Sequence, residues 1–178
     1  MEYLEIVDEE NNLTGKTEER DIIHAKGLWH REISIWIINE NGEVLLQKRS
    51  PKKKQGANKW STSCAGHIDI GEKPIQAAIR ELKEELGIDT TENDLKQILV
   101  VKNARKLANS YNNIFCYIYA LKVNTPIEQY TIEPEELSKI KYIPFKELEQ
   151  LVQEKPADYP FTAREYMPQV IQELKKYI

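Results

Sequence analysis

Three glutamates at helical spacing are the residues of this sequence best suited to chemistry. Glu81, Glu84 and Glu85 lie in the segment 74–86, whose apolar residues recur with the period of a helix. At about 100° per residue, the three carboxylates fall on one arc of that helix. Like charges at this spacing repel one another, and Arg80, four residues before Glu84, offsets only part of the charge. The arrangement predicts a site for a hard divalent cation such as Mg²⁺, which prefers oxygen ligands.

The loop before this helix adds residues that fit a phosphate-binding role. Gly66 and Gly71 allow a tight loop and a close approach of the backbone to a ligand. Glu72 adds a fourth carboxylate at the entry to the helix. Mg²⁺ in proteins is commonly held by carboxylates together with the phosphates of a substrate. We therefore expect a metal-dependent site for a phosphorylated small molecule.

The segment 66–88 resembles the Nudix box, the motif of a family of diphosphate hydrolases. The motif reads Gly, five residues, Glu, seven residues, Arg-Glu, an aliphatic residue, one residue, Glu-Glu, one residue, Gly and an aliphatic residue. All defined positions are filled, by Gly66, Glu72, Arg80, Glu81, Leu82, Glu84, Glu85, Gly87 and Ile88. A glutamate-rich helix taken alone is more often a solvated face. The complete motif favours the functional interpretation.

The resemblance implies a fold, a reaction and roles for the charged residues. The fold class is α/β (α+β), a Nudix-like α/β/α sandwich around a mixed β-sheet. The reaction is hydrolysis of a diphosphate linkage in a nucleoside-diphosphate-linked or other organic diphosphate, with Mg²⁺ or Mn²⁺ as cofactor. The expected metal ligands are Glu81, Glu84, Glu85 and the backbone carbonyl near Gly66. Of these, Glu84 and Glu81 are candidate catalytic groups that Arg80 orients, and Glu72 lies in a shell behind them.

Segments outside the box resemble the branch of the family related to isopentenyl-diphosphate isomerase. They extend the resemblance over most of the chain, and they are Asp8-Glu9, Arg20, His24, Gly27–Arg31, Leu46–Ser50, Lys59-Trp60 and Tyr159–Phe161. This branch raises a rival function, because the isomerase moves a proton on an isoprenoid diphosphate and leaves the diphosphate intact. It uses a cysteine next to a Gly-His pair and a metal held by several His and Glu residues.

Three departures from the isomerase pattern favour hydrolysis. The residue before the Gly-His pair is Ala65, and Cys64 stands one place too early. Asn112 and Asn113 occupy the region where the isomerase has two glutamates. The isomerases also degrade the Arg-Glu…Glu-Glu core of the box, which is intact here. We therefore predict cleavage of a diphosphate, with isomerisation of an alkene and a non-catalytic diphosphate-binding module as the alternatives.

Four residues are candidates for contact with the substrate: Arg49, His67, Glu72 and Glu136. Arg49 ends a predicted strand that borders the site, whereas most basic runs like 48–54 are solvated loops. Glu136 precedes a later strand, and an acidic solvated loop is an equally good interpretation of its surroundings. His24 and His30 also leave two interpretations open. They are either ordinary polar residues, or contacts to substrate phosphate or remnants of the isomerase metal site.

The rest of the chain predicts the elements that position these residues. An Asn-Gly turn separates the β-branched run 33–38 from the segment 44–49, Pro74 suits a first helical turn, and Gly87 suits a left-handed helix stop. The start of the C-terminal helix stays open, because Thr162–Glu165 resembles a capping box, whereas Pro168 would interrupt a helix begun there and suits a first turn better. The expected strands lie at residues 3–7, 13–16, 33–38, 44–49, 99–101, 114–123 and 140–143. The expected helices lie at residues 17–23, 74–86, 144–154 and 166–178.

Length and composition bound the remaining expectations. The chain has 178 residues, of which 40% are hydrophobic, enough to bury one domain core. We expect a single domain overall, with an N-terminal hairpin extension at 1–28 and the Nudix domain at 29–178. The net charge of −4 disfavours a stable nucleic-acid partner. The small-molecule diphosphate is the expected partner, and the N-terminal hairpin with Trp29 is a candidate homodimer surface.

The chain carries no signature of export or of membrane insertion. Its first residues are acidic and lack a long apolar run, which disfavours a signal peptide. The apolar stretches are shorter than the roughly 20 residues that span a bilayer. Two cysteines do not make a disulfide framework in a chain of this length. We therefore expect a cytoplasmic protein without a membrane partner.

Overall fold

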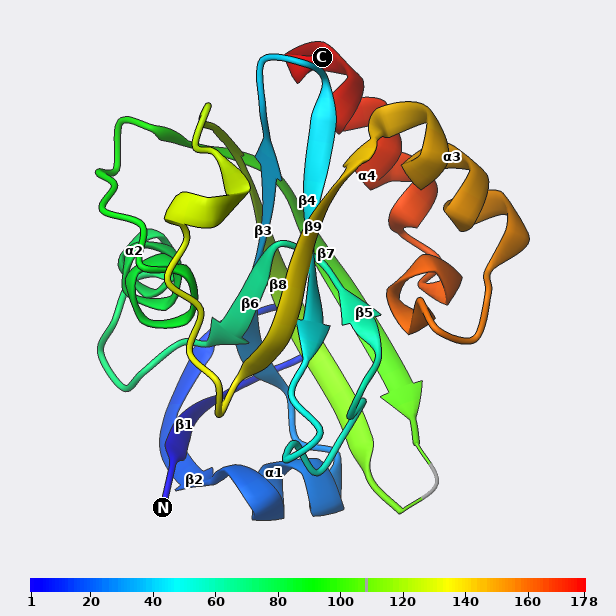
Figure 1. Cartoon of the computed structure of the whole chain (residues 1–178). Coiled ribbons are helices and arrows are strands. Elements are labelled where there is room, and N and C mark those ends of the chain that lie inside the picture. Colours follow the sequence, from blue (N-terminus) through cyan, green and yellow to red (C-terminus); the bar gives the residue numbers. More distant parts are fainter. Residues whose placement is uncertain (108) are drawn as a thin grey trace.

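A mixed sheet between two helical layers forms the body of the computed structural model, which describes residues 1–107 and 109–178. Helix α2 (Pro74–Leu86) covers one face, and α3 (Phe145–Glu154) and α4 (Met167–Leu174) cover the other (Figure 1). The strands of the sheet are β3 (His30–Ile38), β4 (Glu43–Arg49), β5 (Trp60–Ser61), β6 (Cys64–His67), β7 (Leu95–Lys106), β8 (Tyr111–Lys122) and β9 (Leu137–Pro144). The expected α/β/α sandwich around a mixed sheet is confirmed.

The predicted hairpin of β3 and β4 forms, but its two strands soon part. Gly42 has a φ of 70° in the connecting turn, and the strands pair at Ile38 and Val44. Beyond that point β3 pairs in parallel with β8 and antiparallel with β6, whereas β4 pairs antiparallel with β9 and β5. The separation leaves the far ends of β3 and β4 apart, and Glu32 and Arg49 at those ends line one cavity.

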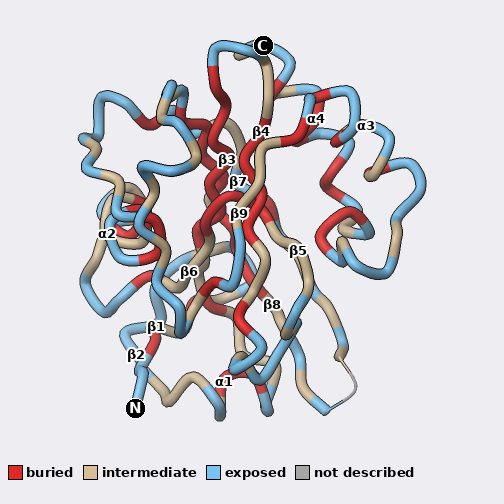
Figure 2. The backbone as a smooth tube through the Cα atoms, viewed as in Figure 1, coloured by how far each residue is buried: buried red, intermediate tan, exposed pale blue. Residues whose placement is uncertain are grey.

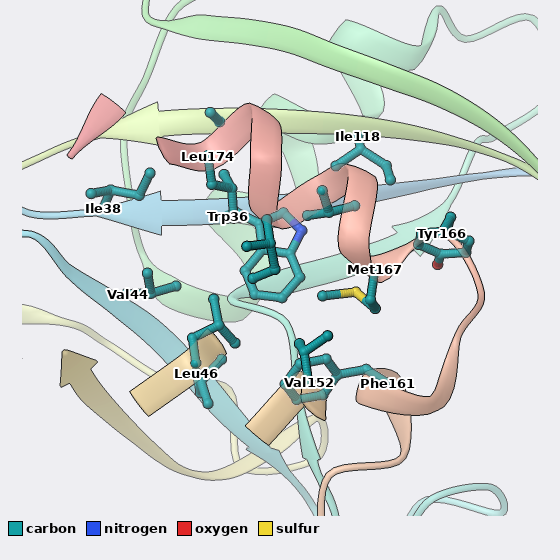
Figure 3. Packing of buried hydrophobic residues seen from close by; sticks show 14 of the residues in the cluster. Trp36, Ile38, Val44, Leu46, Ile118, Val152, Phe161, Tyr166, Met167 and Leu174 are labelled. Atoms are coloured by element: carbon teal, nitrogen blue, oxygen red, sulfur yellow. The ribbon is translucent and has the colours of Figure 1, made fainter. Parts of the chain in front are cut away.

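Two apolar cores hold the layers together, one on each face of the sheet (Figure 2). Ile35, Leu82 and Leu86 belong to the core under α2. Trp36 lies at the centre of the other core, among residues of α3, α4 and the segment between them (Figure 3). Successive residues of β3 point to opposite faces, so Ile35 and Trp36 serve different cores. The sheet is therefore buried on both sides and is a rigid base for the loops at its ends.

The N-terminal residues form a separate two-stranded sheet of β1 (Tyr3–Val7) and β2 (Leu13–Glu19). The expected helical turn at 17–23 is wrong in its start, because Thr17 to Glu19 continue the hairpin and pair with Tyr3 to Glu5. Helix α1 (Arg20–Lys26) begins only after that pairing ends. Trp29, the residue proposed for a dimer surface, packs on Phe115 of the same chain at 5.3 Å between ring centroids.

Most other elements lie where the sequence predicts them, with different ends, but strands β5 and β6 were not predicted. Strand β7 extends well beyond the predicted run 99–101, and β8 begins at Tyr111 instead of residue 114, because the two strands form one long antiparallel pair whose polar residues also join the ladder. The C-terminal segment breaks into the 3₁₀ turn η2 (Pro160–Ala163) and helix α4, with Pro168 in the first turn of α4. Two further 3₁₀ turns are η1 (Ile127–Gln129) and η3 (Lys175–Tyr177). Across the described ranges, the helices are too short or too polar for one to cross a membrane.

Replacing Leu174 with Ala tests the core between α4 and the sheet. Leu174 is fully buried in that core, so its truncation removes apolar contacts and leaves a cavity. We expect the free energy of unfolding to fall by about 2–5 kcal/mol in urea titrations. The exposed neighbour Gln172 is the matched control, and Gln172→Ala is expected to change it by less than about 0.5 kcal/mol. Equal effects of the two substitutions would contradict the packing described for α4.

Candidate active site

Helix α2 carries the predicted carboxylates and follows the sequence prediction from its first residue to its last. Pro74 lies in the first turn, and Gly87 ends the helix with a φ of 70°. The buried residues Ala78, Leu82 and Leu86 fix the helix on the sheet. This packing turns the glutamates toward strand β6, which runs antiparallel to β3 and ends in the Gly-His pair.

Gly66 and Glu81 make the tightest approach between α2 and β6. A Cβ atom on residue 66 would lie 2.1 Å from Oε1 and 2.2 Å from Cδ of Glu81. No side chain fits there unless the carboxylate moves, so glycine is required for this placement of Glu81. The Glu81 side chain is consequently only 14% exposed, and it lies directly over the backbone of β6.

Arg80 connects the carboxylates to one another and to the loop after β6. Its guanidinium donates to both carboxylate oxygens of Glu72, at 3.1 and 2.9 Å, and to Glu81 Oε1 at 2.8 Å. It also donates to Glu84 Oε2 at 3.3 Å and to the carbonyl oxygen of His67 at 3.0 Å. The hydrogen bonds with Glu72 are the largest cause of a raised Arg80 pKa. The guanidinium is therefore permanently charged, and it holds Glu81 and Glu84 close together.

Glu85 is a buried acid without a partner on one oxygen. The residue is 4% exposed, and its Oε2 has no hydrogen-bond partner among residues 1–107 and 109–178. Burial, and after it the charge of Glu81, raise the pKa of Glu85 to about 8. An isolated buried carboxylate is costly, and a cation beside it removes the cost. The donor set of Glu81, Glu84 and Glu85 therefore fits a hard divalent ion.

The glutamates open into a cavity of about 870 Å³. Among the residues that sequence analysis singled out, the cavity lining includes Arg49, Gly66, His67, Glu81, Glu84, Glu85 and Glu136. Arg80 and Glu72 lie behind this lining and act on it through their hydrogen bonds. Glu136 forms an ion pair with Lys53, and Arg49 donates from Nε to the carbonyl oxygen of Gln55 at 3.1 Å.

His67 belongs to a cluster of three imidazoles beside the glutamates. His24, His30 and His67 each offer a ring nitrogen within 4.8 Å of the others, a spacing that could hold a metal ion. Glu2 lies 2.9 Å from His67 Nδ1, and Glu32 lies 3.4 Å from His67 Nε2. Burial alone would lower the pKa of His67, but these two carboxylates raise it to about 9. The two carboxylates therefore favour the protonated form of the ring, whereas a metal ion held by the cluster would require the neutral form.

The cysteine and asparagines that separate this chain from the isomerase pattern also border the site. Ala65 lines the cavity, whereas Cys64 is fully buried in the core under α2, because neighbouring residues of β6 point to opposite sides. Asn112 lines the cavity, and its Oδ1 lacks a hydrogen-bond partner within the described chain. Asn113 instead donates to the carbonyl oxygen of Gly27 at 2.8 Å.

Several polar residues of the cavity were not anticipated from the sequence. They come from distant segments and are Glu2, Glu32, Lys53, Arg105 and Arg164. Lys53 lies in the basic run 48–54, for which the sequence favours a solvated loop. The others carry no local signal, because only the pairing of β1, β3 and β7 and the position of η2 bring them to the cavity.

Comparison with known proteins places the whole arrangement in one family. The family model described as NUDIX domain matches residues 28–164. An uncharacterised Nudix hydrolase of Clostridium acetobutylicum is 36% identical over 157 residues, which cover 86% of this chain and 75% of that protein. Isopentenyl-diphosphate Delta-isomerase 2 of Photorhabdus laumondii is 43% identical over 88 residues, covering 49% of each protein.

Fold comparison agrees over nearly the full length. The crystal structure of protein DR0079 from Deinococcus radiodurans superposes with a TM-score of 0.73 at 17% identity. The superposition covers 97% of this chain and 99% of that one. At this identity the likeness concerns the fold alone.

A double-mutant cycle tests whether the Glu81 side chain packs directly against Gly66. We expect Gly66→Ala to lower the free energy of unfolding by about 1–3 kcal/mol, because the new Cβ displaces the carboxylate. In a Glu81→Ala background the same substitution should cost much less, since the obstructing side chain is gone. Urea titration of the four proteins gives the coupling energy. Additive effects would mean that Gly66 is needed for another reason.

Proposed function

Because the chain belongs to the Nudix hydrolase family, we propose that it cleaves a diphosphate linkage in a nucleoside-diphosphate-linked or other organic diphosphate by attack of water at phosphorus. The observation that carries the proposal is the set of three glutamates, fixed by Arg80 and open to one cavity. Hydrolysis at this site requires a divalent ion, and Mg²⁺ or Mn²⁺ suits the carboxylate oxygens of the three glutamates.

The residues that would hold the ion are Glu81, Glu84, Glu85 and the backbone carbonyl of Gly66. The unpartnered Oε2 of Glu85 supports this assignment, because a bound cation would compensate its buried charge. When bound, such an ion lowers the pKa of a coordinated water and offsets charge on the diphosphate. Arg80 keeps Glu81 and Glu84 in place against their mutual repulsion.

Other groups of the cavity bind the substrate and accept the proton. Arg49 and Lys53 line the cavity on the side of β4 and offer positive charge to phosphate oxygens. Glu84 is the most exposed of the three glutamates, with 59% of its side chain accessible. We propose that Glu84 accepts the proton that the attacking water releases when its oxygen bonds to phosphorus and the bridging P–O bond breaks. The remaining proposed contacts are His67, through its positive charge, and Glu136 at the cavity wall.

The isomerase alternative retains the cluster of His24, His30 and His67, but the cavity, as lined by the described residues, offers it no thiol. Its thiol would have to stand at residue 65, where the chain has alanine, and the sulfur of Cys64 lies in the core. Burial, followed by the charge of Glu85, keeps the pKa of Cys64 well above its usual value. A thiol in that state does not exchange protons with a substrate.

The proposal includes a cytoplasmic location and no stable nucleic-acid partner. Both cysteines are free and buried, which suits a reducing compartment. The homodimer remains a prediction, as does the boundary between the N-terminal extension at 1–28 and the Nudix domain at 29–178.

A substrate panel with Mg²⁺ or Mn²⁺ tests hydrolysis. We expect release of a phosphorylated product from at least one nucleoside diphosphate derivative, dinucleotide or nucleotide sugar. Glu85→Gln should lower kcat/KM by about 100-fold or more, because one ligand charge is lost. The panel includes isopentenyl diphosphate, followed by NMR, so that isomerisation without phosphate release would refute the proposal.

The control for this experiment is Glu92→Gln, which removes an equal charge from an exposed position in the loop before β7. It should leave kcat/KM unchanged. A Glu85→Gln protein that is fully active with unchanged metal dependence would also refute the assignment.

Metal binding is measurable without a substrate. At an Mg²⁺ concentration about 100 times its Kd, bound metal stabilises the native state by about 2.7 kcal/mol, which should raise the Tm. A chelator should reverse the rise, and Glu85→Gln should abolish most of it while Glu92→Gln retains it. Equal Tm shifts in the two variants would place the ion elsewhere.

A further inference from the structure

We propose that Arg105 and Arg164 form an anion subsite that binds a second phosphate group of the substrate, apart from the diphosphate that is cleaved. The inference rests on the proposed function for the reaction and narrows its substrate class. Organic diphosphates that carry an additional phosphomonoester are the compounds that such a subsite would select.

The two arginines reach the cavity from elements that carry none of the metal-site glutamates. Arg105 lies near the end of β7, and Arg164 directly follows η2. Both line the cavity of about 870 Å³ that also contains Glu81, Glu84 and Glu85. The segment with η2 lies on the side of the sheet covered by α3 and α4, opposite α2 (Figure 1). The arginine pair therefore reaches the cavity from a different part of the fold than the glutamates of α2.

The pair carries positive charge that the protein itself does not neutralise. Within the described residues, neither guanidinium forms an ion pair with a carboxylate. Burial, and after it the charge of Arg164, lower the pKa of Arg105. Glu32 is the carboxylate whose charge both arginines sense, but it lies next to two imidazoles, 3.4 Å from His67 Nε2 and 3.6 Å from His30 Nε2. Two guanidiniums that repel each other in a shared cavity require an anion to offset their charge.

Arg164 also has a hydrogen-bond donor that is shielded from water and has no acceptor within the described residues. Its Nη1 donates to the hydroxyl of Tyr166 at 2.7 Å. Its Nε is shielded from solvent and has no acceptor among residues 1–107 and 109–178. Tyr166 is itself buried in the core around Trp36 (Figure 3), so this contact fixes the direction of the guanidinium. A phosphate offers several acceptor oxygens and matches the planar fork of an arginine.

The other basic residues of the cavity already have partners. Lys53 forms an ion pair with Glu136, Arg20 lies 3.4 Å from Glu2, and Arg49 donates to a backbone carbonyl. Arg105 and Arg164 also line an adjoining cavity of about 600 Å³, bounded by β7 and the segment 163–169. The pair thus stands where the two cavities meet, with space for a substrate that extends beyond the cleaved diphosphate.

Binding of inorganic phosphate to the metal-free protein tests the subsite without turnover. With chelator present, a ³¹P NMR titration should give a Kd that rises about tenfold in Arg105→Gln and in Arg164→Gln, since each loses a charge-assisted contact. Lys106→Gln is the matched control, because it removes the same charge from the next residue of β7, which does not line the cavity. It should leave the Kd unchanged. Unchanged affinity in both arginine variants would overturn the proposal.

A matched substrate pair then shows whether the anion belongs to the substrate. Coenzyme A and dephospho-coenzyme A differ in one phosphomonoester, as do NADPH and NADH. We expect kcat/KM with Mg²⁺ to favour the phosphorylated member of at least one pair by about tenfold, and Arg105→Gln to abolish the preference while sparing the other member. Arginine-dependent phosphate binding with equal turnover within both pairs would overturn the assignment to the substrate.

The two proposals fail in different ways. If no diphosphate is hydrolysed under any condition, the proposed function fails, and the phosphate titration still decides whether the arginines bind an anion. If hydrolysis proceeds and the titration shows no effect of either arginine, only the subsite is refuted. Arg164→Lys keeps the charge and loses the fork. It should fold like the native protein and show an intermediate Kd, which separates loss of binding from loss of structure.

Discussion

The guanidinium of Arg80 is the constraint on which the site depends. Without it, three glutamates within two turns of α2 would separate by mutual repulsion, and the loop after β6 would lose its anchor at the carbonyl of His67. One residue therefore fixes both the shape of the carboxylate cluster and its position against Gly66. The buried acid Glu85 completes the cluster from the core side. This combination of a fixed cation outside and an uncompensated acid inside makes a divalent ion a favourable addition.

Local signals predicted much of the fold and about half of the site. Helix α2, its two ends and the residues of the box follow from spacing and end residues, because those depend on near neighbours in the chain. The start of α1 was predicted three residues too early, because pairing with β1 overrides the charge pattern there. Arg105, Arg164 and Glu32 could not be found in this way, since strand pairing and the turn at η2 alone bring them together.

The cavity has an acidic side and a basic side with opposite electrostatic character. On the first, the glutamates of α2 attract cations. On the second, arginines from β7 and the segment after η2 attract anions. His67 also lines this cavity, and it contacts the carboxylates of Glu2 and Glu32. A substrate with its diphosphate on the acidic side and a further phosphate group on the basic side would be oriented along the cavity by both fields.

The early parting of β3 and β4 has a consequence for how such a protein can diversify. Strand β3 and its partner β6 support the helix with the glutamates, whereas β4 continues into the loop with Arg49 and Lys53 and pairs with β5 and β9. The glutamate-bearing helix and the basic loop with Arg49 and Lys53 are thus supported by separate branches of one hairpin. Insertions or exchanges in the second branch can change the preferred molecule while the reactive centre keeps its geometry, so one scaffold can serve many substrates.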